Sequence, residues 1–333
     1  MNFEEEIIKP IEFKDGRVLI LDQRKLPFNE VHLEIDGPER LVNAIKELAI
    51  RGAPLLGLAG VYGLYLASSK SKNFSEFENY SVKIRNARPT AVNLPKVVDE
   101  TMKSINKIKD KRTMEEISNI LLEEARKLEE KLKSESLAIS KNGAELIDKN
   151  DVILTHCNTG TLAVSGFGTA LGIIKYAHKE GKNIKVYFTE TRPLFQGARL
   201  TSFELIKNGI SGTLIVDSAV GYLMREKKIN KVIVGADRIA KNGDTANKIG
   251  TYQIAVLAKM HNIPFLVAAP TSTFDQTISS CKDIPIECRN PAEVRSFGKI
   301  RVAPSRIKVL NPAFDVTPRE LISAFITERG ISS

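Results

Sequence analysis

From residue 150 onward, short apolar segments alternate with longer amphipathic ones, and this alternation constrains the fold more than any other feature. Strands are expected at 151–155, 185–188, 213–216, 231–234, 265–268 and 306–310. Helices are expected near 161–180, 200–207, 218–227, 249–260 and 317–327. Strands that are apolar along their whole length and alternate with helices are typical of a parallel sheet covered on both faces. The sequence therefore predicts an α/β protein with a doubly wound parallel sheet.

The first 140 residues have a different pattern. Segments 18–21 and 31–35 flank a turn that contains Pro27 and predict a short antiparallel pair, and helical spacing follows at 41–48, 96–108 and 113–139. Segment 52–69 has 18 residues without a charge, but its glycines and Pro54 favour a buried helix over a membrane span. We expect a small β and helical-bundle domain at 1–140 and a sheet domain at 141–333.

The composition of the chain limits the classes of ligand and macromolecular partner that we expect. The chain has 333 residues, and lysine plus arginine exceed aspartate plus glutamate by 49 − 40 = 9, which favours anionic ligands. The basic residues form no stripe with interleaved aromatic residues, so we expect no nucleic-acid binding. The segment MNFEEEIIKP is acidic and lacks an apolar signal core, which predicts a cytoplasmic location.

Cysteine and histidine usage predicts no metal centre. The three cysteines show no CxxC spacing, and the four histidines are scattered along the chain. We expect Cys281 and Cys288 to be small buried hydrophobic residues. Cys157 differs because it lies in a glycine-containing loop between a strand and a helix, where backbone N–H groups can lower the pKa of a thiol. From the residues alone, Cys157 is equally consistent with a functional and a structural role.

Polar residues follow five of the predicted strands, where a parallel sheet binds its ligands. These strand-end segments are 156–160, 190–199, 217–218, 235–238 and 270–271. Asp237 lies in one of them and could be a catalytic acid or a turn former. Anion contacts are expected at Arg51, at Arg88, and at Asn247 and Lys248, which we place at the opening of a helix. No Walker motif is present, and Gly166-Phe167-Gly168 lies inside a predicted helix, so nucleotide binding is weakly supported.

Several sequence blocks resemble one family over nearly the whole chain, the 5-methylthioribose-1-phosphate isomerases of methionine salvage. The matching blocks are LDQRKLP (21–27), IRGAP (50–54), RPTAVNLP (88–95), THCNTG (155–160), TETRPLFQGARLT (189–201), VGADRIAKNGDTANKIGTY (234–252) and NPAFDVTP (311–318). The resemblance implies an N-terminal helical domain packed on a Rossmann-like domain, with the site between them. It also implies a homodimer, a small-molecule sugar phosphate as substrate, and no metal or organic cofactor.

The resemblance further implies an aldose-ketose isomerase, which is an intramolecular oxidoreductase, and it assigns roles to individual residues. Cys157 and Asp237 are then the catalytic residues, and the substrate phosphate is bound by Arg51, Gly52, Ala53, Arg88, Gln196, Asn247 and Lys248. Two relatives share this fold: ribose-1,5-bisphosphate isomerase and the non-catalytic regulatory subunits of a translation-initiation exchange factor. Those subunits generally lack the paired Cys and Asp, so the pair favours an enzyme. Whether hydrogen moves as a proton or as a hydride stays open.

Overall fold

The computed structural model describes residues 8–88, 93–280, 283–284, 286–298 and 300–333. The chain forms two compact units, and each contains two stretches of sequence. The first unit comprises Met1–Ser136 and Thr161–Gly168, and the second comprises Leu137–Gly160 and Thr169–Ser333. The segment that follows the first strand of the second unit therefore belongs to the first unit by its contacts.

The first unit opens with a three-stranded antiparallel sheet. Its strands are β1 (Ile11–Lys14), β2 (Arg17–Leu21) and β3 (His32–Ile35), in that order. The predicted antiparallel pair is confirmed as β2 and β3, with Val18 opposite Ile35, and β1 adds a strand that the prediction did not include. Val18 and Ile20 are buried against the helices of this unit because alternate residues of a strand face the same side.

The helices of the first unit surround α2 (Ala53–Lys70), which is buried on nearly all its faces. The others are α1 (Pro38–Lys46), α3 (Phe74–Arg85), α4 (Asn93–Asn106), α5 (Met114–Ala144) up to Ser136, and α6 (Thr161–Val164), with a 3-10 turn at Lys109–Lys111. Small residues let α4 approach α2 closely, since a Cβ at Gly60 would lie 2.9 Å from Leu94 Cδ1. Within the described ranges, no helix combines the length and apolar character needed to cross a membrane.

The second unit is built on a seven-stranded sheet in the order β16-β15-β10-β7-β4-β5-β6. Its strands are β4 (Val152–Thr155), β5 (Lys185–Thr189), β6 (Gly212–Ile215), β7 (Lys231–Val234), β10 (Phe265–Ala268), β15 (Ala324–Thr327) and β16 (Gly330–Ser332). All neighbours pair in parallel except β15 and β16. The predicted α/β fold class is confirmed.

Helices cover both faces of this sheet. Ile153, Ile233 and Leu266 pack in one core with the end of α5, with α7 (Ala170–Lys179) and with α8 (Ser202–Lys207). The alternate residues Leu154 and Val232 pack in a second core with α9 (Val220–Arg225) and α10 (Thr251–Met260). Short turns precede several helices or join strands: a π-helical turn at Gly197–Thr201, and 3-10 turns at Asp217–Ala219, Thr271–Thr273 and Arg319–Leu321.

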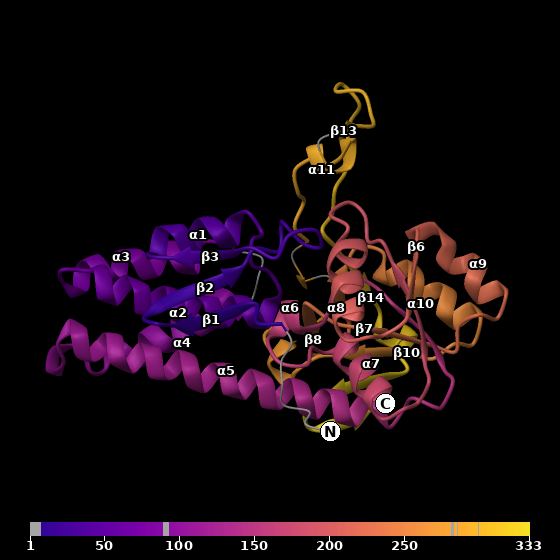
Figure 1. Cartoon of the computed structure of the whole chain (residues 1–333), viewed down its shortest axis with the longest axis horizontal. Helices are drawn as coiled ribbons and strands as arrows, with labels where there is room; N and C mark the ends of the chain where they lie inside the picture. Colours follow the sequence, from indigo (N-terminus) through magenta and orange to yellow (C-terminus); the bar gives the residue numbers. More distant parts are fainter. Residues whose placement is uncertain (1–7, 89–92, 281–282, 285, 299) are drawn as a thin grey trace. The chain divides into compact units, whose positions relative to one another are not determined.

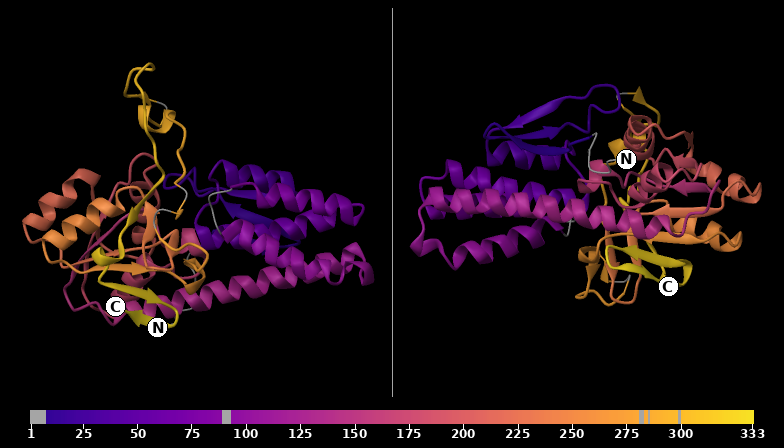
Figure 2. Two further views of the ribbon diagram at one scale, coloured as in Figure 1. Left: turned by 180° about the vertical axis from the view of Figure 1, so that it is seen from behind. Right: turned by 60° about the horizontal axis from the view of Figure 1, so that its bottom comes forward.

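Two further features extend from the second unit. A small sheet in the order β11-β8-β9-β14 consists of β11 (Phe274–Asp275), β8 (Arg238–Ala240), β9 (Thr245–Lys248) and β14 (Phe314–Thr317). An arm carries α11 (Ala292–Arg295), β12 (Ser296–Phe297) and β13 (Ile300–Arg301). In Figures 1 and 2 the arm, in orange to yellow, projects away from the large sheet.

Three predicted elements are wrong. The helix expected at 161–180 is interrupted between α6 and α7, because Ser165, Gly166 and Gly168 adopt positive φ angles of 74°, 74° and 102°. The strand expected at 306–310 is absent, and that segment is an exposed part of the chain between β13 and β14. The helix expected at 317–327 is a 3-10 turn followed by β15, whose four buried residues pair with β10. A short apolar run cannot be assigned to helix or strand by its spacing alone, and the pairing with β10 decides it.

Cys281 and Cys288 are both predicted to be buried hydrophobic residues. Cys288 is exposed, so its predicted burial is wrong. It lies in the connection that leads into the arm, where its backbone forms a single antiparallel bridge with Pro312. Cys281 lies outside the described residues.

Candidate active site

The large sheet has one point where its strand order reverses. The strands that follow β4 along the chain lie first on one side of it, as β5 and β6, and then on the other side, as β7 and β10. Ligands of doubly wound sheets bind at this point, beyond the carboxyl ends of the strands. Cys157 follows β4 and Asp237 follows the neighbouring strand β7. The structure thus places both predicted catalytic residues in loops on either side of the switch point.

The backbone of Cys157 is held in an unusual conformation. Its φ angle is 63°, in the left-handed region that few residues other than glycine adopt. Its N–H donates to Thr191 Oγ1 at 3.0 Å, and its carbonyl accepts from Thr201 Oγ1 at 2.6 Å. The residue is buried. Two threonine hydroxyls therefore fix the peptide groups on both sides of the Cys157 Cα, and such enforced strain is characteristic of functional sites.

The loop after β5 is strained in the same way. Thr191 also has a φ angle of 63°, which is costly for a β-branched residue. The Asp217 carboxylate at the end of β6 accepts the N–H groups of Thr191 and Arg192 at 2.8 Å and 2.7 Å. Burial, together with the nearby negative charge of Asp217, raises the pKa of Glu190 above its ordinary value. Three neighbouring strand ends are thereby connected through side chains.

A buried ion pair between Lys175 and Glu204 contacts the loop that contains Cys157 and Asn158. Lys175 Nζ lies 2.5 Å from Glu204 Oε2, and both side chains are almost fully buried. Glu204 Oε1 also accepts from Asn158 Nδ2 at 2.9 Å. A Cβ on Gly160 would lie 2.2 Å from Glu204 Oε2, so only glycine fits there. The paired charges hold the loop that follows β4 against α8.

His156 lies directly before Cys157 and is fully buried. Its Nδ1 is 2.6 Å from Thr189 Oγ1 and its Nε2 is 2.9 Å from the carbonyl oxygen of Ile249. Burial lowers the pKa of His156 below its ordinary value, so the ring is neutral at pH 7. The ring fills the space beside Gly250, where a Cβ would lie 3.1 Å from His156 Cε1.

Asp237 and the predicted anion-binding pair belong to the small sheet. Asp237 is half-buried, and its N–H donates to the carbonyl of Ala246 at 2.9 Å. Asn247 and Lys248 are buried at the end of β9. Lys248 Nζ donates to the carbonyl of Ala313 at 3.0 Å and lies 4.9 Å from the centre of the Phe314 ring.

The placement of Asn247 and Lys248 at a helix opening is wrong, because α10 begins at Thr251. The N–H groups at that helix start are already used by a protein carboxylate. Asp315 Oδ2 accepts from Gly250 N–H at 2.7 Å and Asp315 Oδ1 from Tyr252 N–H at 3.1 Å. Burial raises the pKa of Asp315 to about 6. Phosphate binding at this position would therefore depend on side chains and not on the helix start.

Gln196 has the strongest sign of an open ligand contact. Its side chain is buried, yet its Oε1 has no hydrogen-bond partner among the described residues. A buried carbonyl oxygen without a donor is costly, so a ligand hydroxyl or N–H would satisfy it. The neighbouring Arg192 instead donates to the carbonyls of Val294 and Ser296 in the arm.

The first unit carries the remaining predicted residues. Arg51 Nε donates to Gln23 Oε1 at 3.2 Å, and Gln23 Nε2 donates to the Leu162 carbonyl at 2.8 Å. Gly52 has a φ angle of 99°, and a Cβ there would lie 2.2 Å from the carbonyl oxygen of Ala163. Gly52 is thus required by both its conformation and its close packing, and Ala53 begins α2. The buried Gln23 holds Arg51 by its Nε.

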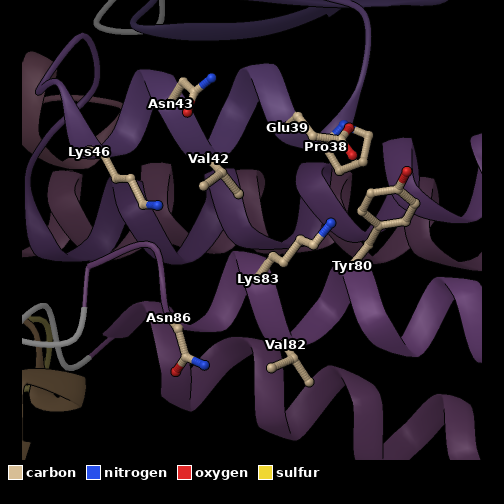
Figure 3. A pocket seen from close by; sticks show the side chains of 9 residues that line it. All are labelled: Pro38, Glu39, Val42, Asn43, Lys46, Tyr80, Val82, Lys83 and Asn86. Carbon is tan, nitrogen blue, oxygen red and sulfur yellow. The ribbon is translucent and has the colours of Figure 1, made fainter.

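Arg88 is half-buried and follows α3. Pro89 and Thr90 of the same predicted motif lie outside the described residues. A separate hollow of about 410 Å³ lies between α1 and α3, lined in part by Val42, Lys46, Tyr80 and Lys83 (Figure 3). It contains none of the predicted site residues.

Sequence reasoning missed several residues of these networks. They are Gln23, His156, Lys175, Thr189, Thr191, Thr201, Glu204 and Asp315. Most of them lie inside the sequence blocks that carry the resemblance, and a polar residue next to a strand end was the available signal. Across the described ranges, no group of three or more His, Cys, Asp or Glu residues is arranged to hold a metal ion.

Relatives of known name cover nearly the whole chain. It is 49% identical over 330 residues to a methylthioribose-1-phosphate isomerase of Acetivibrio thermocellus. The matching region covers 97% of this chain and 96% of the relative. It is 50% identical over 330 residues to a protein of the same name from Dehalococcoides mccartyi, with 97% and 98% covered.

Two solved structures are also similar over nearly the whole chain. The 5-methylthioribose 1-phosphate isomerase of Pyrococcus horikoshii matches with a TM-score of 0.91 and 38% identity, over 99% of this chain and 96% of that chain. A structure described as the delta subunit of translation initiation factor eIF-2B from A. fulgidus matches with a TM-score of 0.85 and 44% identity, over 97% and 95%. Residues 49–333 match the family described as the initiation factor 2 subunit family. The chain therefore belongs to the initiation factor 2 subunit family and, within it, groups with the methylthioribose-1-phosphate isomerases.

Proposed function

We propose that this protein is an aldose-ketose isomerase that converts 5-methylthioribose 1-phosphate to 5-methylthioribulose 1-phosphate in methionine salvage. The observation that carries the proposal is the placement of Cys157 and Asp237 at adjacent strand ends on either side of the switch point. The full-length similarity to isomerases of this name supports the choice of substrate.

The chemistry explains why a cysteine and an aspartate are needed. The anomeric oxygen of the substrate is esterified with phosphate, so the ring cannot open as a free hemiacetal does. We propose that Asp237 protonates the ring oxygen while the bond from C1 to that oxygen breaks, and then takes the proton of the C2 hydroxyl. A hydrogen moves from C2 to C1, which leaves a ketone at C2 and a CH2 group that carries the phosphate.

Two routes for that hydrogen involve Cys157 differently. In one, Cys157 carries a proton between C2 and C1 through an enolate. In the other, a hydride moves directly and Cys157 positions the sugar. Substrate deuterated at C2 separates them, since full retention of deuterium at C1 in ordinary water supports the hydride and loss to solvent supports the carrier.

We further propose that the substrate phosphate is bound by Arg51, Gly52, Ala53, Arg88, Gln196, Asn247 and Lys248. We also propose that residues 1–140 form one domain and that residues 141–333 form the catalytic domain. The buried, unpartnered Oε1 of Gln196 supports a contact with a donor such as a sugar hydroxyl, and only its Nε2 could donate to a phosphate oxygen. The hydrogen bond from Arg51 Nε to Gln23 Oε1 fixes one edge of the guanidinium, and a guanidinium can bind a phosphate through two parallel N–H groups.

The test is a side-by-side NMR assay of two substrates without added metal or nucleotide. We expect turnover of 5-methylthioribose 1-phosphate and slower or no turnover of ribose 1,5-bisphosphate, with no loss in the presence of a chelator. Faster turnover of the bisphosphate would favour that isomerase instead. No turnover of either would favour a regulatory subunit, as the description of the A. fulgidus structure suggests.

A homodimer and a cytoplasmic location complete the proposal. The edge strand β6 supports a second copy as the partner, because an exposed sheet edge with apolar side chains can pair with another chain. Leu214 and Val216 are exposed on β6 and directly after it, Ile206 and Tyr222 on the helices α8 and α9, and Phe297, Ile300, Val302 and Leu310 on the arm and in the segment that follows it. Sedimentation equilibrium should give twice the chain mass, and Leu214→Asp should shift it toward the monomer.

A further inference from the structure

A continuous chain of hydrogen bonds leads from Cys157 to the turn after β9. Cys157 N–H contacts Thr191 Oγ1 at 3.0 Å, and Thr191 Oγ1 lies 3.1 Å from Thr189 Oγ1. Thr189 Oγ1 lies 2.6 Å from His156 Nδ1, and His156 Nε2 lies 2.9 Å from the Ile249 carbonyl. His156, Thr189 and Thr191 are all buried, so these contacts are shielded from water.

The two ends of the chain determine the direction of every bond in it. The Ile249 carbonyl can only accept, so His156 Nε2 carries a hydrogen. In a neutral ring Nδ1 then accepts, and the Thr189 hydroxyl must donate to it. Thr189 has no second hydrogen to give, so the Thr191 hydroxyl donates to Thr189. Thr191 Oγ1 is left as the acceptor for Cys157 N–H, which can only donate.

Charging the ring would reverse this order. A protonated His156 would donate from Nδ1 to Thr189, and the Thr189 hydroxyl would then turn toward Thr191. Burial of His156 and the neighbouring positive charge of Lys248 oppose that state, whereas Asp217 favours it. With one protonation state and one tautomer, the bonds from the ring to Thr189 and Ile249 have a single direction, and the Thr191 hydroxyl has the Thr189 carbonyl oxygen, at 3.4 Å, as an alternative acceptor to Thr189 Oγ1.

We infer that His156 is a positioning residue, which as the neutral Nε2–H tautomer ties the strained Cys157 loop to the turn that follows Asn247 and Lys248. This inference rests on the proposed function for the reaction it serves. Both nitrogens of the imidazole already bond to protein groups. It acts by holding Cys157 N–H through two threonine hydroxyls, and by holding the Ile249 carbonyl next to the end of β9. The Cys157 conformation, with its φ angle of 63°, is stable only while that hold persists.

The first experiment reads the tautomer directly. In protein labelled with 15N-histidine, long-range proton–nitrogen spectra distinguish Nδ1–H, Nε2–H and charged rings for all four histidines. We expect one histidine to be a fixed, neutral Nε2–H ring at pH 7. Thr189→Val removes the donor to Nδ1, and the signal that it shifts is assigned to His156. Thr189→Ser retains the hydroxyl and should leave that signal close to its position in the parent.

The second experiment measures the effect on Cys157. Thr191→Val has the shape of threonine but leaves the Cys157 N–H without an acceptor. We expect about a tenfold fall in kcat with KM changed less than twofold, and faster hydrogen exchange at the Cys157 amide. Thr191→Ser restores the hydroxyl and should recover most of both. His156→Asn loses the contact with Ile249 as well, so its KM should rise together with the fall in kcat.

An Nδ1–H tautomer or a charged His156 at pH 7 would overturn the inference, and so would Thr191→Val with an unchanged kcat. A purely structural role would lower the stability of Thr191→Val and would leave the kcat of the folded enzyme intact. If the parent protein converts neither substrate, the proposed function fails. The tautomer and the Cys157 amide exchange would still decide whether His156 holds this loop.

Discussion

Removing Lys175 should destabilise the second unit more than removing any exposed lysine. The Lys175 and Glu204 side chains are 4% and 0% exposed, and Lys175→Met would leave the Glu204 carboxylate buried without its cation. Breaking a buried ion pair from one side costs about 3–5 kcal/mol. The remaining donation from Asn158 Nδ2 to Glu204 offsets part of that, so we expect about 3 kcal/mol.

Thermal and urea unfolding measure this loss. For a unit of this size, about 3 kcal/mol corresponds to a fall in Tm of roughly 6–12 °C. The double variant Lys175→Met with Glu204→Gln removes the uncompensated charge and should recover more than half of the lost free energy of unfolding. The matched control is Lys127→Met, which breaks a pair with Glu124 whose side chains are 71% and 51% exposed and should cost less than about 0.5 kcal/mol.

The reasoning is refuted if Lys175→Met costs no more than Lys127→Met. It is also refuted if the double variant is less stable than Lys175→Met alone. Measuring kcat gives a second test of the Lys175→Met effect, because Glu204 accepts a hydrogen bond from Asn158, the residue after Cys157. The folded Lys175→Met protein should lose kcat, and the control should not.

Three further predictions concern the reaction and the pH dependence of folding. Asp237→Asn retains size and hydrogen bonding but cannot deliver a proton, so kcat should fall about 10²–10⁴-fold with little change in KM; turnover within threefold of the parent would remove Asp237 from the mechanism. Gln23→Leu removes the hydrogen bond to Arg51 Nε and should raise KM about tenfold while kcat changes less than threefold, which steady-state assays over a range of substrate concentrations would show. The pKa of Asp315 is about 6 in the folded protein, above its ordinary value, so as pH falls the folded state binds a proton at Asp315 before the unfolded state does. The stability that this protonation contributes is complete below pH 4 and is lost as pH rises through 6. Urea unfolding should therefore show the parent losing roughly 2–3 kcal/mol relative to Asp315→Asn between pH 4 and pH 7, and equal slopes would contradict this.

The central strands β7 and β10 could be predicted because almost all of their residues are buried. They occupy the residues expected for them, since a short run of three or four apolar residues between helices is typical of a buried strand in such a fold. The switch point followed from the same pattern, because strand ends can be located without knowing any contact.

What failed depended on contacts between distant residues. Residues 324–327 form a strand because they pair with β10. Asn247 and Lys248 belong to strand β9 because they pair with β14. The occupation of the α10 start by Asp315 joins positions 65 residues apart, and no local pattern reports it. The same holds for His156, whose partners Thr189 and Ile249 lie 33 and 93 residues away.

The path of the chain has a consequence for synthesis. The polypeptide passes between the two units three times, at 136–137, 160–161 and 168–169. The first unit is therefore incomplete until residue 168 has left the ribosome, because α6 supplies the Leu162 carbonyl to Gln23 and the surface that packs on Gly52. By then β4 of the large sheet has also emerged, but its two neighbouring strands, β5 and β7, have not yet been synthesised. A nascent chain arrested near residue 140 should remain open to protease around Gln23 and Gly52, and protection should appear only in longer chains from which α6 has left the ribosome.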